Sequence, residues 1–445
     1  MTAIDPPVPG VDRHRLSRRA FLGSATVAGT MGLSGCGSLT GVLGNQNATA
    51  TTTVQFWTLF SGGDGAAMKS IVERFNDEQP LGDVRIERQR IPWNEYYTKL
   101  YTALVADTGP DIAIMHQALM GRFQAMLDPF DDFLGSDTRS HYVPTLYDRM
   151  TVDDQQLALP LDAHPIGIYY NRSLFESAGL DPDAPPTDFE SFRAACDAIV
   201  SETDAHAFAS ALDPIGMMRT FIAVLNQRGG SLLSDDRNSV AFDGDAGLAT
   251  AQLFADITGN YGWDVPNADN QRARVAFRDN NLAMIVNGSW YAAVCESIDG
   301  FDWGAFKPFI APDKQRDVTE SGSHAIVLPR NPTRSEETTR TAVATAEWIT
   351  QKNPIWGTTA GHLPAATDAL NSNALRDSPL WPKSISIFSE MANDDQFAYL
   401  PRAPFNVNEG STWDFLGDIY AHTVSPKAGI SRGAETVQGV IDDVK

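Results

Sequence analysis

Residues 53–57, Thr-Val-Gln-Phe-Trp, open the stretch of sequence that decides the fold class. Their β-branched and aromatic side chains predict a strand. Residues 66–76 follow with apolar side chains spaced i, i+3, i+4 and i+7, which is the pattern of one helix face. A strand-like run at 84–88, a helical pattern at 96–105 and a third strand-like run at 111–115 complete a β-α-β-α-β order. This order predicts an α/β domain with a largely parallel sheet.

The rest of the chain continues the alternation. Further helices are predicted at 188–201, 220–228, 246–258 and 336–350, and further strands at 166–171, 282–286 and 325–328. Thr187 is the predicted N-cap of the first of these helices, with Glu190 three residues on as in a capping box. Ligands of parallel sheets bind beyond the carboxyl ends of the strands. Here those ends fall just after Trp57, near Trp93 and around His116.

The chain is strongly acidic. Its 445 residues contain 34 Lys and Arg against 56 Asp and Glu, for a net charge of −22. Phosphate binding needs clustered basic side chains, so we expect no nucleic-acid partner. A hydrophobic content of 42% indicates a globular protein with sizeable cores.

The first 36 residues are typical of an export signal. Arginines at 13, 15, 18 and 19 precede an uncharged stretch at 21–34 that is too short to span a bilayer. Residues 17–22, Ser-Arg-Arg-Ala-Phe-Leu, resemble the twin-arginine export motif. Residues 33–36, Leu-Ser-Gly-Cys, resemble a lipobox. We therefore expect a signal peptide at 1–35, lipidation of Cys36, a flexible tether at 36–52 and attachment to the outer face of the cell membrane.

Two further cysteines, Cys196 and Cys295, lie about 100 residues apart in the sequence. A twin-arginine substrate folds in a reducing compartment before export. We therefore favour two buried free thiols over a disulfide, which the spacing alone does not exclude.

The order of several segments resembles the extracellular solute-binding proteins of ABC importers, in the family 1, sugar-binding branch that includes the maltose-binding proteins. The resemblance extends from about residue 53 to 435. It is carried by Val54-Gln55-Phe56-Trp57, Gly109-Pro110-Asp111-Ile112, Leu159-Pro160, Ile168-Tyr169-Tyr170-Asn171-Arg172-Ser173-Leu174-Phe175, Ala178-Gly179-Leu180, Pro185-Pro186-Thr187-Asp188-Phe189-Glu190 and Asn287-Gly288-Ser289-Trp290.

The resemblance implies an α/β, two-lobed periplasmic-binding-protein fold of type II, the Venus-flytrap form, with strands crossing at a hinge. It places lobe one at 53–164 plus 320–367 and lobe two at 165–319 plus 368–445. It also implies a monomer without enzymatic activity or cofactor. Such a protein captures a sugar or oligosaccharide by hinge closure and delivers it to permease subunits in the membrane.

Sugars present an apolar C–H face and a belt of hydroxyl groups, which proteins meet with aromatic rings and with polar side chains. Trp57 and Trp93 are candidate ligand contacts because they lie at predicted strand ends. Trp290 and Trp413 are candidates because the resemblance implies ligand contacts at their positions. Trp348 stands on an Ala-rich helix face and is expected in the core.

The polar candidates lie at the same strand ends and crossings. They are Ser61, Asp64, His116, Asp162, His164, Gly322, His324 and His362. Gly322 belongs to a small-residue segment that permits close approach of the backbone to a ligand. None of the histidines has the paired local spacing of a metal motif, so the sequence predicts no metal site.

Two other classes remain open. A secreted carbohydrate-active enzyme would need two carboxylates flanking a bond, and no nucleophile elbow or P-loop is present. A receptor for a non-sugar solute, such as a polyamine, a polyol phosphate or a ferric ion, would share the fold but not the ligand.

Overall fold

The computed structural model describes residues 52–210, 213–264, 270–401, 407 and 410–443. The predicted signal peptide and Cys36 lie outside these residues. So does the predicted tether, except for Thr52, with which β1 begins. No helix among the described residues combines the length and the apolar character needed to cross a bilayer.

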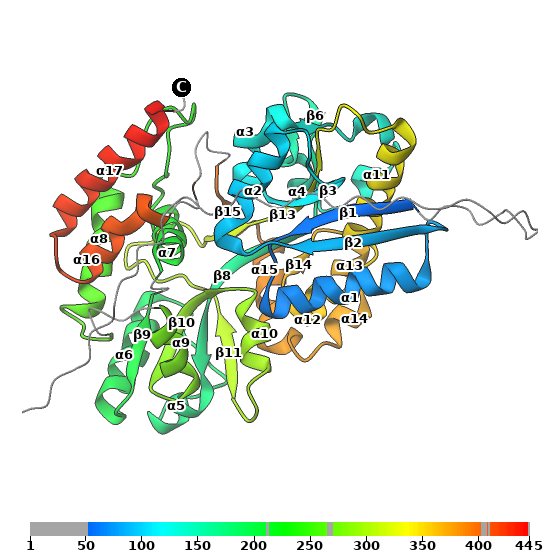
Figure 1. Ribbon diagram of the computed structural model, residues 1–445. Helices are drawn as coiled ribbons and strands as arrows, with labels where there is room; N and C mark the ends of the chain where they lie inside the picture. Colours follow the sequence, from blue (N-terminus) through cyan, green and yellow to red (C-terminus); the bar gives the residue numbers. More distant parts are fainter. Residues whose placement is uncertain (1–51, 211–212, 265–269, 402–406, 408–409, 444–445) are drawn as a thin grey trace, which may run out of the picture. The chain divides into compact units, whose positions relative to one another are not determined.

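The first sheet contains the elements predicted from the opening stretch, in the order β2-β1-β3-β13-β4, with β7 also paired to β13 (Figure 1). Its strands are β1 (Thr52–Thr58), β2 (Val84–Arg90), β3 (Ile112–His116), β4 (Leu127–Asp128), β7 (Ala158–Pro160) and β13 (His324–Pro329). The first three strands are parallel, and β13 runs antiparallel to β3.

The second sheet has the order β15-β12-β8-β10-β9, with β11 and β14 also paired to β8. Its strands are β8 (Asp162–Asn171), β9 (His206–Ala209), β10 (Leu282–Gly288), β11 (Trp303–Phe306), β12 (Thr319–Gly322), β14 (Leu363–Pro364) and β15 (Phe397–Tyr399). A separate hairpin joins β5 (Thr151–Val152) and β6 (Gln155–Gln156).

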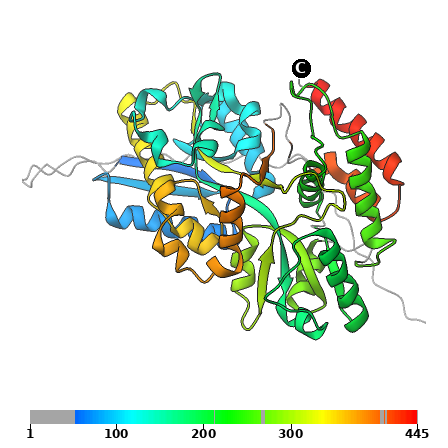
Figure 2. The same ribbon diagram turned by 180° about the vertical axis from the view of Figure 1, so that it is seen from behind.

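Helices cover both sheets. They are α1 (Gly62–Glu78), α2 (Trp93–Val105), α3 (Met120–Phe123), α4 (Pro144–Asp148), α5 (Arg172–Ser177), α6 (Phe189–Glu202), α7 (Pro214–Gln227), α8 (Asp245–Thr258), α9 (Asn270–Arg278), α10 (Tyr291–Glu296), α11 (Glu336–Gln351), α12 (Ile355–Ala360), α13 (Thr367–Leu370), α14 (Asn373–Arg376), α15 (Ser386–Asn393), α16 (Asp414–Tyr420) and α17 (Pro426–Asp443). Figures 1 and 2 show α8, α16 and α17 packed together, and α7 connects this group to β12.

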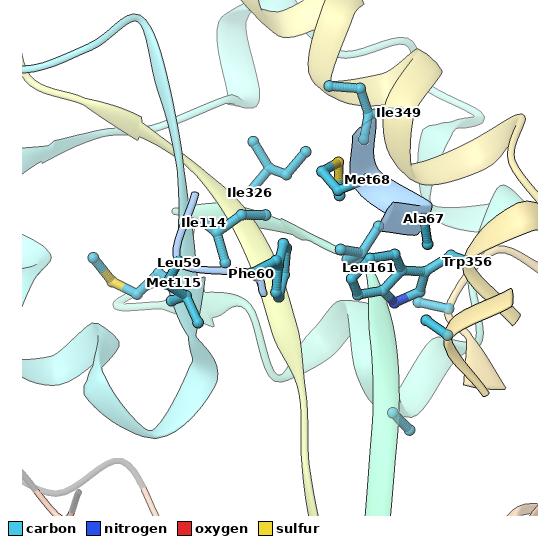
Figure 3. Close-up of a cluster of buried hydrophobic side chains, with 14 of the residues drawn as sticks. Leu59, Phe60, Ala67, Met68, Ile114, Met115, Leu161, Ile326, Ile349 and Trp356 are labelled. Carbon is cyan, nitrogen blue, oxygen red and sulfur yellow. The ribbon is translucent and has the colours of Figure 1, made fainter. Parts of the chain in front are cut away.

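The apolar face predicted for residues 66–76 is the face of α1 that is buried. Its members Met68 and Phe75 belong to a large apolar cluster that joins α1 to the first sheet. Figure 3 shows part of this cluster, in which Leu161 lies beside Trp356, and the rings of Phe60 and Trp356 are in contact.

The helix predicted at 188–201 is α6, but its cap differs from the prediction. Asp188, not Thr187, is the N-cap, and its carboxylate accepts a hydrogen bond from the backbone N–H of Ser191. The Ser191 side chain closes the capping box in place of Glu190. A carboxylate accepts the N3 amide in the same geometry as a threonine hydroxyl and also favours the helix dipole, so the cap shifts by one residue.

The cysteine prediction is confirmed. Cys196 and Cys295 are both free and buried, and they lie in different apolar clusters. Burial raises the pKa of each thiol above the ordinary cysteine value.

Candidate functional site

The chain passes between the two sheets three times, and two of these passages are neighbours, whereas the third runs from β13 to β14 by way of α11 and α12. The first passage joins β7 to β8 through Leu161, and the second joins β12 to β13 through Ser323. The strands on either side pair with one another. His164 of β8 lies opposite Gly322 of β12, and His324 of β13 lies opposite His116 of β3. Histidines that are far apart in the sequence are thereby brought together.

A cavity of about 540 Å³ lies at these passages and is lined from both sheets. Eight of the predicted site residues line it: Ser61, Asp64, Trp93, His116, His164, Trp290, Gly322 and His324. Its size lies within the range of small-molecule sites, which is roughly 300–1,000 Å³.

The other four predicted residues do not line the cavity. Trp57 is half-buried on β1 and packs against the apolar cluster of the first sheet. Asp162 and His362 are fully buried, and they contact residues that line the cavity. Trp413 is fully buried, with its indole N–H donated to the carbonyl of Val407. Trp413 therefore packs as a core residue, because the helix that follows it turns the ring into the second apolar cluster.

Asp162 organises the inner wall of the cavity. Its Oδ1 accepts hydrogen bonds from His164 Nδ1 at 2.9 Å and from the His324 backbone N–H at 2.9 Å. Its Oδ2 accepts from His324 Nδ1 at 2.7 Å and from Trp356 Nε1 at 2.7 Å. Burial alone would raise the pKa of Asp162, but the histidines around it outweigh burial and hold that pKa well below the usual range. The four donors therefore surround an ionised carboxylate.

His116 and His164 are imidazoles in a desolvated setting. Burial lowers the pKa of both rings well below the ordinary histidine value, and the neighbouring His324 lowers it further. The hydroxyl of Tyr97 lies 2.5 Å from His116 Nδ1 and also accepts the His116 backbone N–H at 3.0 Å. Both rings are consequently neutral at physiological pH.

His362 behaves in the opposite way. Burial alone would lower its pKa, but Asp64 and then Asp162 raise it above the ordinary value. Its Nε2 lies 3.3 Å from Asp64, its Nδ1 lies 2.9 Å from Ser289 Oγ, and its ring stacks on Trp356. His362 thus links a cavity carboxylate to the buried core.

Arg219 of α7 joins three parts of the cavity wall. Its guanidinium binds the carboxylate of Glu320 through Nε at 2.6 Å and Nη2 at 3.2 Å, and Nη2 also donates to the His164 carbonyl. The guanidinium lies over the Trp290 ring, 4.9 Å from its centroid. Burial raises the pKa of Glu320, and Arg219 only partly offsets that rise.

Two tryptophans offer different surfaces to a ligand. The ring of Trp290 is half-buried, with Arg219 over it and the backbone of Gly288 close against it, where a Cβ would lie 2.0 Å from the ring. Trp93 begins α2 and is 41% exposed, with its ring edge-on to His116. Trp93 therefore has the larger free aromatic surface for stacking.

Comparison with known proteins identifies the family of this chain. The family model for bacterial extracellular solute-binding proteins matches residues 70–383. The chain belongs to this family. Solute-binding proteins of known structure share its two-lobed arrangement. The cyclic alpha-maltosyl-1,6-maltose binding protein of Arthrobacter globiformis superposes with a TM-score of 0.74 at 22% identity, over 88% of this chain and 100% of that chain.

Other solute-binding proteins give the same result. The maltose-maltodextrin binding protein of Alicyclobacillus acidocaldarius has a TM-score of 0.71 at 19% identity, over 87% of this chain and 100% of that chain. At these identities the likeness shows the fold. The sn-glycerol-3-phosphate-binding periplasmic protein of Escherichia coli is 31% identical over 157 residues, which is 32% of this chain and 34% of that protein. A binding protein of Brucella abortus is 25% identical over 137 residues. The matched segments span about a third of the length of these curated relatives.

Arg219 and Glu320 line the cavity of this solute-binding protein but were not predicted from the sequence as site residues. Both stand inside apolar segments, since Arg219 follows Met217-Met218 in a largely buried helix and Glu320 lies in a buried strand. The sequence does contain one signal for these residues, which is a single charged residue inside an apolar segment. Such a residue is predicted to be buried, and a buried charge requires a partner. The sequence does not show that the two residues are partners, since they are 101 positions apart.

Proposed function

We propose that this chain is the substrate-binding lipoprotein of an ABC importer that captures a sugar or oligosaccharide outside the cytoplasmic membrane. In this proposal a lipid on Cys36 holds the protein at the membrane after twin-arginine export, and the loaded form docks on permease subunits. The ligand is bound without turnover.

The observation that carries the proposal is the combination of groups around the cavity at the two passages. Trp93 supplies an aromatic face, while Asp64, Asn287 and Gln117 supply acceptors and donors for hydroxyl groups. Sugars need this mixture, whereas an apolar solute would gain nothing from so many polar groups.

Hinge closure is the expected mechanism of capture. The predicted lobes, 53–164 with 320–367 and 165–319 with 368–445, would pivot about the passages near Leu161 and Ser323. Because the cavity is lined from both sheets, a bound sugar would contact both lobes only in the closed state. Differential contact of this kind shifts the population toward closure. The boundaries themselves stay a prediction.

Calorimetric titration with a panel of maltose-type oligosaccharides and monosaccharides tests the proposal. One sugar should bind with a micromolar or lower Kd. Trp93→Ala should weaken that sugar at least tenfold, because one stacked ring contributes roughly 1.4 kcal/mol or more when it covers a sugar face. Trp290→Ala should also weaken it at least tenfold, through loss of the ring and of the support for Arg219.

Trp348→Ala is the matched control, because Trp348 is a partly buried tryptophan of α11 that does not line the cavity. It should leave the Kd unchanged. Release of reducing ends from an oligosaccharide would instead show an enzyme. Binding of glycerol phosphate with no sugar binding would show a polyol phosphate receptor.

A further inference from the structure

Three histidine rings converge on the inner wall of the cavity. The ring centroids of His164 and His324 are 4.2 Å apart, those of His116 and His324 are 4.6 Å apart, and those of His116 and His164 are 5.8 Å apart. One ring nitrogen from each histidine lies within 4.8 Å of the other two. All three side chains line the cavity.

The Nδ1 atom of each of these rings already has a hydrogen-bond partner. Each oxygen of Asp162 also accepts from a group that can only donate, the His324 backbone N–H on Oδ1 and the Trp356 Nε1–H on Oδ2. Both oxygens are therefore acceptors, and Nδ1 of His164 and Nδ1 of His324 donate to them. A neutral ring with a hydrogen on Nδ1 presents a lone pair at Nε2. A metal on Nε2 of His116 would leave the ring hydrogen on Nδ1, and the Tyr97 oxygen, 2.5 Å away, is placed to accept it.

We propose that His116, His164 and His324 form a binding site for one divalent first-row transition metal, such as Zn²⁺, through their Nε2 atoms. Three imidazoles with one open position are a common donor set for such ions. Histidines that bind metals almost always donate their other ring hydrogen to a carboxylate or another acceptor, and Asp162 is that acceptor for His164 and His324.

Metal binding requires the three rings to move closer together. Metal–nitrogen bonds of about 2.05 Å in a tetrahedral site place the ligand nitrogens roughly 3.3 Å apart. The ring nitrogens now lie within 4.8 Å of one another, so they would approach by up to about 1.5 Å. His116 is the last residue of β3 and is less buried than the other two histidines. Asp162 lies directly behind two of the ligands and holds both rings through their Nδ1 atoms.

A second group in the same wall is less suited to a metal. Asp162, His324 and His362 also bring ligand atoms within 4.8 Å of one another. However, each oxygen of Asp162 already accepts two hydrogen bonds, so its lone pairs are occupied. Asp162 consequently positions the ligands rather than binding the ion.

The proposed metal site can be tested apart from the proposed sugar ligand. If an ion binds, a water molecule or an oxygen of the solute would complete its coordination from the cavity that the three histidines line. Metal binding should therefore be measured first without any sugar, so that a failure of one proposal does not decide the other.

The test uses the purified protein without a polyhistidine tag. Zn²⁺ is titrated by calorimetry, and Co²⁺ is titrated by visible absorption, which reports tetrahedral nitrogen coordination. The wild type should bind one ion per chain with a Kd below about 1 µM. His116→Gln should bind at least tenfold more weakly, and it leaves Asp162 with all four of its donors. His206→Ala, which removes an exposed histidine at the start of β9, should match the wild type.

Three results would overturn the proposal. The first is no saturable binding of Zn²⁺ or Co²⁺ up to about 100 µM. The second is a Co²⁺ spectrum of octahedral oxygen coordination. The third is equal affinity in the wild type and in His116→Gln. Circular dichroism of each variant establishes that it is folded. If His116→Gln does not fold, Tyr97→Phe replaces it, with an expected loss of about tenfold, and an unchanged affinity would again contradict the site.

Discussion

Replacing Arg219 by Met should destabilise the protein in a way that depends on pH. Glu320 is fully buried, and the 11% exposed Arg219 side chain supplies the ion-pair partner of its carboxylate. Met keeps much of the side-chain volume but removes that partner. Breaking a buried ion pair by deleting one member costs about 3–5 kcal/mol when the remaining charge stays ionised.

Protonation of Glu320 limits this cost. Protonating a carboxyl group requires about 1.4 kcal/mol for each pH unit above its pKa. Starting from the ordinary glutamate pKa of 4.5, protonating the Glu320 carboxylate costs about 3.4 kcal/mol at pH 7 and about 1.4 kcal/mol at pH 5.5. The folded-state pKa of Glu320 is raised above the unfolded value, so its contribution to stability is retained at low pH and lost as pH rises. We expect Arg219→Met to cost about 3 kcal/mol at pH 7 and less than half of that at pH 5.5.

Urea unfolding followed by tryptophan fluorescence at the two pH values measures this effect. The double variant Arg219→Met/Glu320→Gln removes the stranded charge and should recover at least half of the loss at pH 7. Arg139→Met is the control, because Arg139 forms an exposed ion pair with Asp148, and it should change stability little at either pH. An equal loss of stability at both pH values, or no recovery in the double variant, would show that the loss does not come from an unpaired Glu320 carboxylate.

Two further predictions concern buried groups. Gly322→Ala should destabilise the protein by about 1–3 kcal/mol and disturb the histidine cluster, because its Cβ would lie 2.0 Å from His164 Nε2. At Gly439 of α17 an added Cβ would meet nothing within 4 Å, so Gly439→Ala should be neutral or stabilising. Urea unfolding measures both variants, and an equal change in the free energy of unfolding would show that the close contact at Gly322 has no effect on stability. Cys196 and Cys295 should resist alkylation in the folded protein at pH 8, because burial raises the pKa of both thiols and keeps them protonated, and both should react after unfolding. Mass spectrometry locates the modified sites, and fast labelling of either thiol before unfolding would show that it is exposed.

The sequence predicted the framework of the fold because its signals are local. Apolar spacing at 66–76 and 336–350 identified α1 and α11, and the β-rich run at 166–171 identified β8. Element ends were less accurate. His116 was expected just after a strand but is the last residue of β3, because its backbone continues the pairing with β13.

The candidate site depends on pairings between distant segments. His164 and His324 meet because β8 and β12–β13 cross side by side, and nothing in their local sequence shows that register. The prediction of no metal site was made because the histidines lack paired spacing along the chain, and spacing does not show how close strand pairing brings the three rings. Trp413 was predicted to contact the ligand but is fully buried. A tryptophan in a polar segment has the same local sequence whether its ring faces a cavity or the core.

The proposed function requires that this solute-binding protein hold a sugar in the cavity lined by Trp93 and Asp64. Calorimetry of the wild type and Trp93→Ala with the same sugar, supported by small-angle scattering with and without it, tests this requirement. We expect stoichiometric binding without hydrolysis, at least tenfold weaker binding in the variant, and a more compact protein when the sugar is bound. Sugar binding that is unaffected by Trp93→Ala and leaves the scattering unchanged, or no binding by any sugar, would contradict the proposed function.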